Sequence, residues 1–150
     1  MESRSLLRVG IISGYFNPIH VGHIDLIERS REVVDVLYVI VNSDFQRELK
    51  GSREFMSEGE RSRIVSSIKG VTGCFISIDR DRSVCSSLGM VYRDVSSYYS
   101  WYDLEFKFIN GGDRSNGEIP EVGVCEERGI EILDGFGDKV QSSSWLLNKE

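Results

Sequence analysis

The sequence contains no alanine, a single threonine and only three cysteines among its 150 residues. The cysteines, Cys74, Cys85 and Cys125, are odd in number and show no metal-ligand spacing. We therefore expect small buried thiols in a reducing compartment. No run approaches the roughly 18–20 apolar residues of a membrane span, and Met1 to Leu7 is charged rather than signal-like. A cytoplasmic location with no membrane partner is expected.

Two common nucleotide-binding motifs are also missing. The sequence has neither a Gly-x-x-x-x-Gly-Lys-Ser/Thr phosphate loop nor a Gly-x-Gly-x-x-Gly fingerprint, which argues against P-loop kinases and NAD-dependent oxidoreductases. The net charge of −6 argues against non-specific nucleic-acid binding, because backbone phosphates require a broad basic surface. Any anion site must be a local concentration of positive groups.

Apolar runs and helical patterns alternate along the chain. Short β-branched runs predict buried parallel strands at 8–13, 36–41, 73–78, 105–109 and 130–133. Helices are predicted at 21–32, from the capping box at Ser57 to a stop at Gly70, near 83–91 and near 119–128. The alternation predicts a doubly wound, Rossmann-like parallel α/β sheet, and residues 1–150 are expected to form a single domain. Ligands of such sheets bind beyond the carboxyl ends of the strands.

The loop after the first strand contains both histidines of the chain, His20 and His23. At positions i and i+3 they share one helix face at the amino end, where unpaired N–H groups and the dipole favour an anion. Gly22 between them lets a phosphate approach the backbone closely. An imidazole can stabilise the charge that builds up during phosphoryl or nucleotidyl transfer. The alternative is that both rings only cap the helix.

The stretch from Gly14 to His23 resembles the His-x-Gly-His signature of the cytidylyltransferase-like nucleotidyltransferase superfamily. Further blocks follow in matching order, and they look like those of glycerol-3-phosphate cytidylyltransferases and heptose-phosphate adenylyltransferases. The resemblance spans about residues 8 to 148. Its further blocks are Asn42–Asp44 with Leu49–Gly51, Glu60-Arg61 with Ile64-Val65, Asn110–Asp113, and Lys139–Ser144.

The resemblance implies roles for these residues. His20, His23 and Lys50 are the expected catalytic residues; Lys50, in a polar loop, would reach the β- and γ-phosphates. Expected nucleotide contacts are Gly14, Tyr15, Phe16, Gly22, Arg61, Gly111, Gly112, Asp113, Lys139, Gln141, Ser142, Ser143 and Ser144.

Several of these residues also have simpler interpretations. Arg61 or Arg63 could pair within its helix with Glu58 or Glu60. The turn at Gly111–Asp113 could be a plain β-turn, and Ser142–Ser144 could be a simple N-cap.

Two stretches depart from the family pattern. Asn17 stands where many relatives have aspartate. Asn17 and Asp44 are the residues expected to contact the acceptor. The segment from Tyr92 to Phe106 is rich in aromatic residues. It is either a lid over the acceptor, a subunit contact, or ordinary core and surface.

The expected activity is transfer of CMP from CTP to a small phosphate- or phosphonate-bearing acceptor, with release of pyrophosphate. Magnesium is expected with the triphosphate, with few direct protein ligands. ATP with a sugar phosphate is the alternative, and a catalytically silent nucleotide-binding module is another. Relatives are often dimers, so the resemblance also implies a homodimer.

Overall fold

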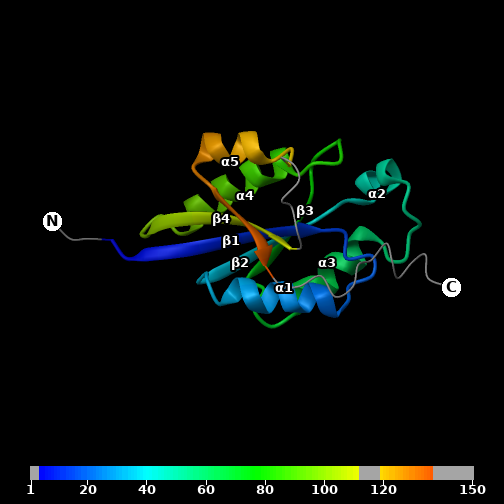
Figure 1. Ribbon diagram of the computed structural model, residues 1–150, viewed down its shortest axis with the longest axis horizontal. Helices are drawn as coiled ribbons and strands as arrows, with labels where there is room; N and C mark the ends of the chain where they lie inside the picture. The colour runs from blue at the N-terminus through cyan, green and yellow to red at the C-terminus, as the bar shows by residue number, and fades with distance from the viewer. Residues whose placement is uncertain (1–3, 112–118, 137–150) are drawn as a thin grey trace.

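Within residues 4–111 and 119–136, which the computed structural model describes, five strands form one parallel sheet (Figure 1). Its order is β3-β2-β1-β4-β5, and every neighbouring pair is parallel. The strands are β1 (Leu6–Gly14), β2 (Val36–Val41), β3 (Gly73–Ile76), β4 (Asp103–Gly111) and β5 (Glu131–Phe136). The parallel α/β sheet predicted from the sequence is therefore confirmed.

Apolar side chains on both faces of the sheet explain why the central strands read as nearly continuous hydrophobic runs. In β1, Val9 and Ile11 belong to one buried cluster, while Ile12 belongs to the other. In β2, Tyr38 and Ile40 face the first cluster, and alternate residues face the second. The core is thus divided into two layers by the sheet.

Helices cover both faces of the sheet (Figure 1). On one face α1 (Val21–Arg31) contributes Ile27, and α3 (Glu58–Ser66) contributes Val65. On the other face lie α4 (Cys85–Tyr98) and α5 (Val122–Arg128). A further short helix, α2 (Asp44–Lys50), follows β2 directly.

Some boundaries differ from those predicted. Lys50 was expected in a polar loop, and that prediction is wrong, because Lys50 is the last residue of α2. Strand β3 ends at Ile76, two residues early, because Ser77 and Asp79 turn away to bind the start of α4. Helix α3 begins after its N-cap Ser57, as predicted, but ends well before Gly70.

The aromatic segment lies at the opposite end of the sheet from the carboxyl edge. Its first half extends α4 to Tyr98, and Asp103 then begins β4 next to the first residue of β1. Tyr98 and Trp101 are 77% and 86% exposed. Because ligands of such sheets bind at the carboxyl ends, this position does not favour a lid over the acceptor, one of the three interpretations given above.

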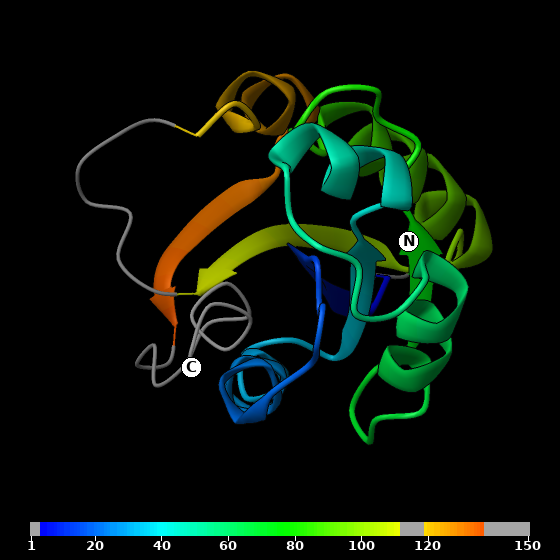
Figure 2. The ribbon, with the colours of Figure 1, turned by 90° about the vertical axis from the view of Figure 1, so that its right-hand side faces the viewer.

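Figure 2 views the carboxyl ends of the strands. The chain moves from β1 outward to β2 and β3, then returns to add β4 and β5 on the other side. The reversal makes the gap between the ends of β1 and β4 the topological switch point, where open α/β sheets bind their ligands. The histidine loop leaves β1 at this point.

Candidate active site

The two histidines form a reciprocal cap at the start of α1. His20 is the N-cap residue in an extended conformation, and its Nδ1 accepts a hydrogen bond of 3.0 Å from the backbone N–H of Gly22. Nδ1 of His23 accepts one of 3.1 Å from the backbone N–H of His20. The rings stack with centroids 3.9 Å apart. The same two hydrogen bonds therefore cap the helix and fix the positions of the two rings.

These hydrogen bonds fix the tautomer of both neutral rings. A nitrogen that accepts a hydrogen bond carries no proton, so in each neutral ring the proton resides on Nε2. Each ring then carries a proton on Nε2 that it can donate, at a helix N-terminus that itself favours negative charge. Nε2 of His20 is buried in the structure, so an anion would have to reach it from within the site. Such a pair of donors suits an anion whose charge grows during a reaction.

The buried ring of Phe16 packs against the ring of His23. Its backbone has the left-handed φ of 53°, its side chain is 1% exposed, and its ring centroid lies 4.6 Å from that of His23. A Cβ atom on Gly14 would come within 3.0 Å of the Phe16 ring. Gly14 therefore makes room for the ring, and the Phe16 side chain packs inward.

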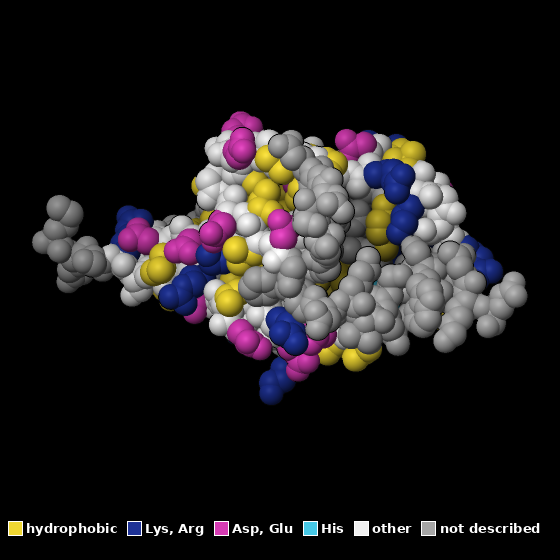
Figure 3. Space-filling view, viewed as in Figure 1, with side chains coloured by type: hydrophobic (Ala, Val, Ile, Leu, Met, Phe, Trp, Pro, Cys, Tyr) yellow, Lys and Arg dark blue, Asp and Glu magenta, His cyan; other side chains and the backbone are white. Residues whose placement is uncertain are grey.

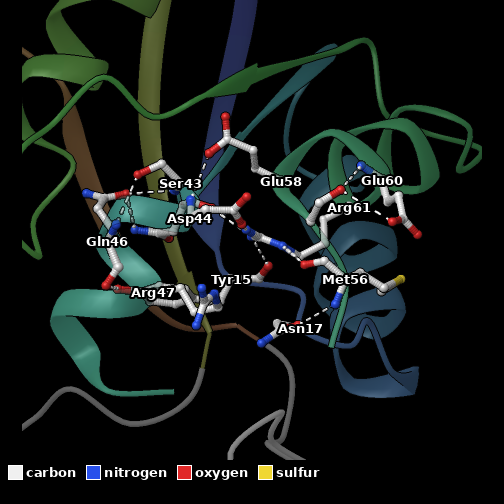
Figure 4. Close-up of polar contacts among 12 residues, drawn as sticks. Tyr15, Asn17, Ser43, Asp44, Gln46, Arg47, Met56, Glu58, Glu60 and Arg61 are labelled. Atoms are coloured by element: carbon white, nitrogen blue, oxygen red, sulfur yellow. Dashed lines mark hydrogen bonds and ion pairs between the residues drawn. The ribbon is translucent and has the colours of Figure 1, made fainter. Parts of the chain in front are cut away.

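Arg61 joins three segments of the site (Figure 4). Its guanidinium is fully buried and donates to the carbonyls of Met56, Tyr15 and Asn42 at 3.0, 2.8 and 2.6 Å. It also forms a 2.6 Å ion pair with Asp44. The intrahelical pair with Glu58 or Glu60 is not the one that forms. A nucleotide contact of Arg61 stays a prediction, and the interactions described here are structural.

Asn17 holds the segment before α3 against the histidine loop. Its side chain is 2% exposed; Nδ2 donates to the carbonyl of Arg53 at 2.8 Å, and Oδ1 accepts from the backbone N–H groups of Phe55 and Met56 (Figure 4). An amide serves here as both donor and acceptor. Aspartate could supply only the acceptor half when ionised.

Lys50 and Tyr15 meet at the end of α2. The Lys50 ammonium lies 4.4 Å from the centroid of the Tyr15 ring, a cation–π distance. Burial raises the pKa of the Tyr15 hydroxyl, and the charges of Arg82 and Arg61 partly oppose that rise. The structure thus brings two predicted site residues together beside the histidine loop.

Gln46 is a site-supporting residue that the sequence interpretation missed. It is fully buried, and its Nε2 donates to the carbonyls of Asp81 and Ser83 at 2.8 and 2.7 Å. Its Oε1 accepts from the backbone N–H of Ser43, while Ser43 caps α2 in return. The signal was in the sequence, because Ser43 and Gln46 form a capping box.

On the other side of the switch point, at the ends of β4 and β5, the structure describes the chain only up to Gly111 and from residue 119 to 136. Gly111 ends β4, and Nδ2 of the buried Asn110 donates to Asp134 on β5 at 3.0 Å.

Within the described residues no group of three or more His, Cys, Asp or Glu could hold a metal ion. No helix of the described part is long and apolar enough to cross a membrane. The predicted site residues outside the described ranges are Gly112, Asp113, Lys139, Gln141, Ser142, Ser143 and Ser144.

This sheet order places the histidine loop and the N-terminus of α1 at the switch point, where doubly wound α/β proteins bind their ligands. The model of cytidylyltransferase-like proteins matches residues 11–105. The chain therefore belongs to the cytidylyltransferase-like family, within the nucleotidyltransferase superfamily, as its motifs predicted.

Two kinds of relatives are similar in sequence. The bifunctional protein HldE of Hyphomonas neptunium is 31% identical over 129 residues, covering 85% of this chain and 24% of that protein. The phosphopantetheine adenylyltransferase of Borreliella burgdorferi is 28% identical over 123 residues, covering 77% of this chain and 72% of that enzyme. The chain thus spans about a quarter of the HldE protein.

Solved structures share the fold. A lipopolysaccharide core biosynthesis protein from Thermoplasma volcanium aligns with a TM-score of 0.61 and 19% identity, over 87% of this chain and 97% of that one. A NadR protein in complex with NAD and AMP-PNP aligns with a TM-score of 0.55 and 16% identity, over 92% and 40%. At these identities the likeness concerns the fold alone.

Proposed function

We propose that the chain is a nucleotidyltransferase that moves a nucleoside monophosphate from a triphosphate to a phosphate or phosphonate group of a small acceptor. An acceptor oxygen attacks the α-phosphorus and forms the new P–O bond. The bond between the α-phosphorus and the α–β bridging oxygen breaks, and pyrophosphate leaves with the electron pair. Much of the rate comes from holding two mutually repelling anions together.

The observation that carries this proposal is the pair of stacked imidazoles at the N-terminus of α1. With Nδ1 of each ring bound to a backbone N–H, the Nε2–H groups become the donors to the α-phosphate and the departing pyrophosphate. Lys50 would add positive charge to the triphosphate, with Ser142–Ser144 and Lys139 as further expected contacts. The Gly111–Asp113 turn would line the nucleoside.

Magnesium would bind mainly to phosphate oxygens, where it offsets the charge of the triphosphate. Asp44, a carboxylate beside the site, is already paired with Arg61. Magnesium would therefore be held by the phosphate oxygens and not by this side chain. The chain's own contribution would be the positive groups around the phosphates.

The proposal does not fix which nucleoside triphosphate is the donor. CTP is the nucleotide expected from the sequence, but the motif blocks are common to cytidylyltransferases and adenylyltransferases, and one relative is by name an adenylyltransferase. We propose ATP as the first nucleotide to test, with CTP beside it and small sugar phosphates and phosphonates as acceptors. Pyrophosphate release and the mass of the product would identify both substrates. Binding of nucleotide with no pyrophosphate from any acceptor would instead indicate a silent binding module.

The histidines can be tested without unfolding the helix. Asparagine is a good N-cap residue, so His20→Asn keeps an acceptor for the N–H of Gly22 but removes the Nε2 donor. In the same way His23→Gln keeps an oxygen that can accept from the N–H of His20, as in a capping box. We expect His20→Asn and His23→Gln to lower kcat about 10²–10³-fold, the loss of one charge-stabilising donor. Arg63→Gln, on an exposed position of α3, is the control. Near-normal turnover in both histidine variants would remove the proposed mechanism.

A further inference from the structure

The side chain of Tyr15 lies along one face of helix α2. Its hydroxyl donates a long hydrogen bond of 3.5 Å to the carbonyl of Gln46, and the Lys50 ammonium lies 4.4 Å from the centroid of its ring. Gln46 and Lys50 are four residues apart in α2, so they lie on the same face of the helix. One aromatic side chain from the loop after β1 therefore spans a full turn of α2.

The backbone on each side of this contact is fixed. Tyr15 follows Gly14, the last residue of β1, and its carbonyl accepts from the buried guanidinium of Arg61 at 2.8 Å. Lys50 is the last residue of α2, and the left-handed Gly51 caps the helix directly after it. Because both backbones are held, the position of the lysine ammonium depends on its own side chain and on the ring beneath it.

An aromatic ring holds an ammonium group differently from a carboxylate. A carboxylate cancels the charge of the cation, whereas a ring attracts it through the electrons of its face and leaves the full charge available. Burial raises the pKa of the Tyr15 hydroxyl, so the phenol is neutral near pH 7. The Tyr15 ring can therefore orient Lys50 without competing as an anion with a phosphate.

The surroundings of Lys50 are rich in positive charge. Arg47 and Lys50 both belong to the last turn of α2, and Figure 3 shows Lys and Arg side chains gathered over this helix. Neighbouring cations repel each other. A lysine also loses many side-chain conformations when it binds a ligand. A ring that already holds the ammonium reduces the entropy lost on binding.

We propose that Tyr15 is a positioning residue, whose ring holds the Lys50 ammonium in place for the β- and γ-phosphates of the triphosphate. The inference rests on the proposed nucleotidyltransferase function, in which Lys50 adds positive charge to the triphosphate. It is distinct from a direct nucleotide contact, because the ring acts through the lysine. Its effect should therefore appear only when Lys50 and the β- and γ-phosphates are all present.

The first experiment measures the proton chemical shifts of the lysine ε-methylene groups by NMR. Protons over the face of an aromatic ring are shielded, so the Lys50 signal, identified by its loss in Lys50→Met, should lie upfield of the Lys107 signal. Lys107 is the internal control because it is paired with Glu105 at 2.9 Å. Tyr15→Phe should keep the shielding and Tyr15→Leu should remove it, while Tyr98→Leu, which removes a 77% exposed tyrosine, should leave it unchanged. An unshielded Lys50 signal, or one that Tyr15→Leu does not move, would overturn the inference.

The second experiment measures by calorimetry the binding of α,β-methylene ATP and of AMP. Tyr15→Leu should weaken binding of the triphosphate analogue about 3–30-fold, the range of one cation–π contact. It should leave AMP binding unchanged, because AMP has no β- and γ-phosphates. Tyr15→Phe should lose less affinity than Tyr15→Leu because it keeps a ring face. In a Lys50→Met background, Tyr15→Leu should have no further effect.

The outcomes separate the inference from the proposed function. Equal losses for the analogue and AMP, full affinity of Tyr15→Leu for the analogue, or a further loss in the Lys50→Met background would each contradict the positioning role. Failure of the parent chain to bind either α,β-methylene ATP or its CTP counterpart would instead contradict the proposed function. Full affinity of Lys50→Met for the analogue would contradict the part of that function assigned to Lys50.

Discussion

Three buried polar side chains connect segments that are distant in the sequence. Arg61, Gln46 and Asn17 are 0%, 0% and 2% exposed, and each binds backbone groups of at least one other segment. A buried polar group costs free energy unless it is hydrogen-bonded. Because the bonds of these three require one particular arrangement of loops, they favour that arrangement over others of similar apolar burial.

Replacing Arg61 with methionine should destabilise the protein strongly. The change leaves three carbonyl groups and the Asp44 carboxylate without their partner. We expect the free energy of unfolding to fall by about 3–5 kcal/mol, as when one member of a buried ion pair is removed. Urea denaturation would measure it. Arg63→Met, on the exposed side of the same helix, should change stability by about 0.5 kcal/mol or less.

The variants Asn17→Asp and Asn17→Ala should lose stability in a fixed order, the alanine variant losing more. Asn17→Asp keeps the acceptor for Phe55 and Met56 but cannot donate to the Arg53 carbonyl, so a loss of about 1 kcal/mol is expected. Asn17→Ala removes all three bonds and should cost more. The same denaturation series tests the order, and hydrogen exchange should quicken at Phe55 and Met56 in the alanine variant. An alanine variant as stable as the aspartate variant would contradict this role.

Sequence reasoning could find the histidines but not the partners of Arg61. His20 and His23 are three residues apart in one loop, so a local motif places them on one helix face. The carbonyls that Arg61 binds belong to residues 15, 42 and 56, which meet only after the sheet has formed. For the same reason the sequence did not indicate that the side-chain amide of Asn17 forms hydrogen bonds with the backbone of the loop before α3.

At the scale of the elements, serine N-caps begin two helices near the site. Ser43 accepts from the N–H of Gln46 at 3.1 Å, and Ser57 accepts from the N–H of Glu60 at 3.3 Å. Helix α2 ends at Lys50 and is capped by Gly51, whose φ of 82° lies in the left-handed region. The caps fix where Lys50 and Arg61 lie relative to the strand ends.

The two caps should differ in their contribution to stability. Ser57→Ala removes a cap at an exposed helix start and should cost about 1 kcal/mol. Ser43→Ala should cost more, by about 1 kcal/mol, because it leaves the buried N–H of Gln46 without an acceptor. Chemical denaturation of the two variants in parallel provides the measurement. Equal losses would mean that burial of the α2 cap does not matter.

The strands were easier to predict than the helices. Strand β2 has the predicted bounds, because a run of apolar residues buried on both faces has few alternatives. Helix α2 has only seven residues, of which just Gln46 is buried, so it shows no apolar periodicity. Helix α4 runs on to Tyr98, beyond the predicted end, because Val95 packs in the core.

At the scale of the whole molecule, the thiols should make stability depend on pH in the alkaline range. Burial raises the pKa of Cys74 and of Cys125 from 9.0 to about 11. The unfolded chain therefore releases these protons at lower pH than the folded chain, and the free energy of unfolding falls as pH rises from 9 to about 11. The contribution is fully present below pH 9.

Urea denaturation at several pH values in that range tests the effect. The double variant Cys74→Ala/Cys125→Ala should be less stable throughout, but its stability should fall less steeply with pH than that of the parent chain. The difference between the two slopes isolates the thiols from tyrosine and lysine, which titrate in the same range. Parallel slopes would show that neither thiol is protected by the fold.

The reciprocal cap of α1 makes the charge state of the site and the integrity of a helix turn interdependent. Each imidazole must leave one nitrogen without a proton to accept a backbone N–H. A ring that takes up a second proton loses that ability, and the turn loses the bond. Acid would therefore do two things at once: place positive charge on the rings and loosen the turn that aims them.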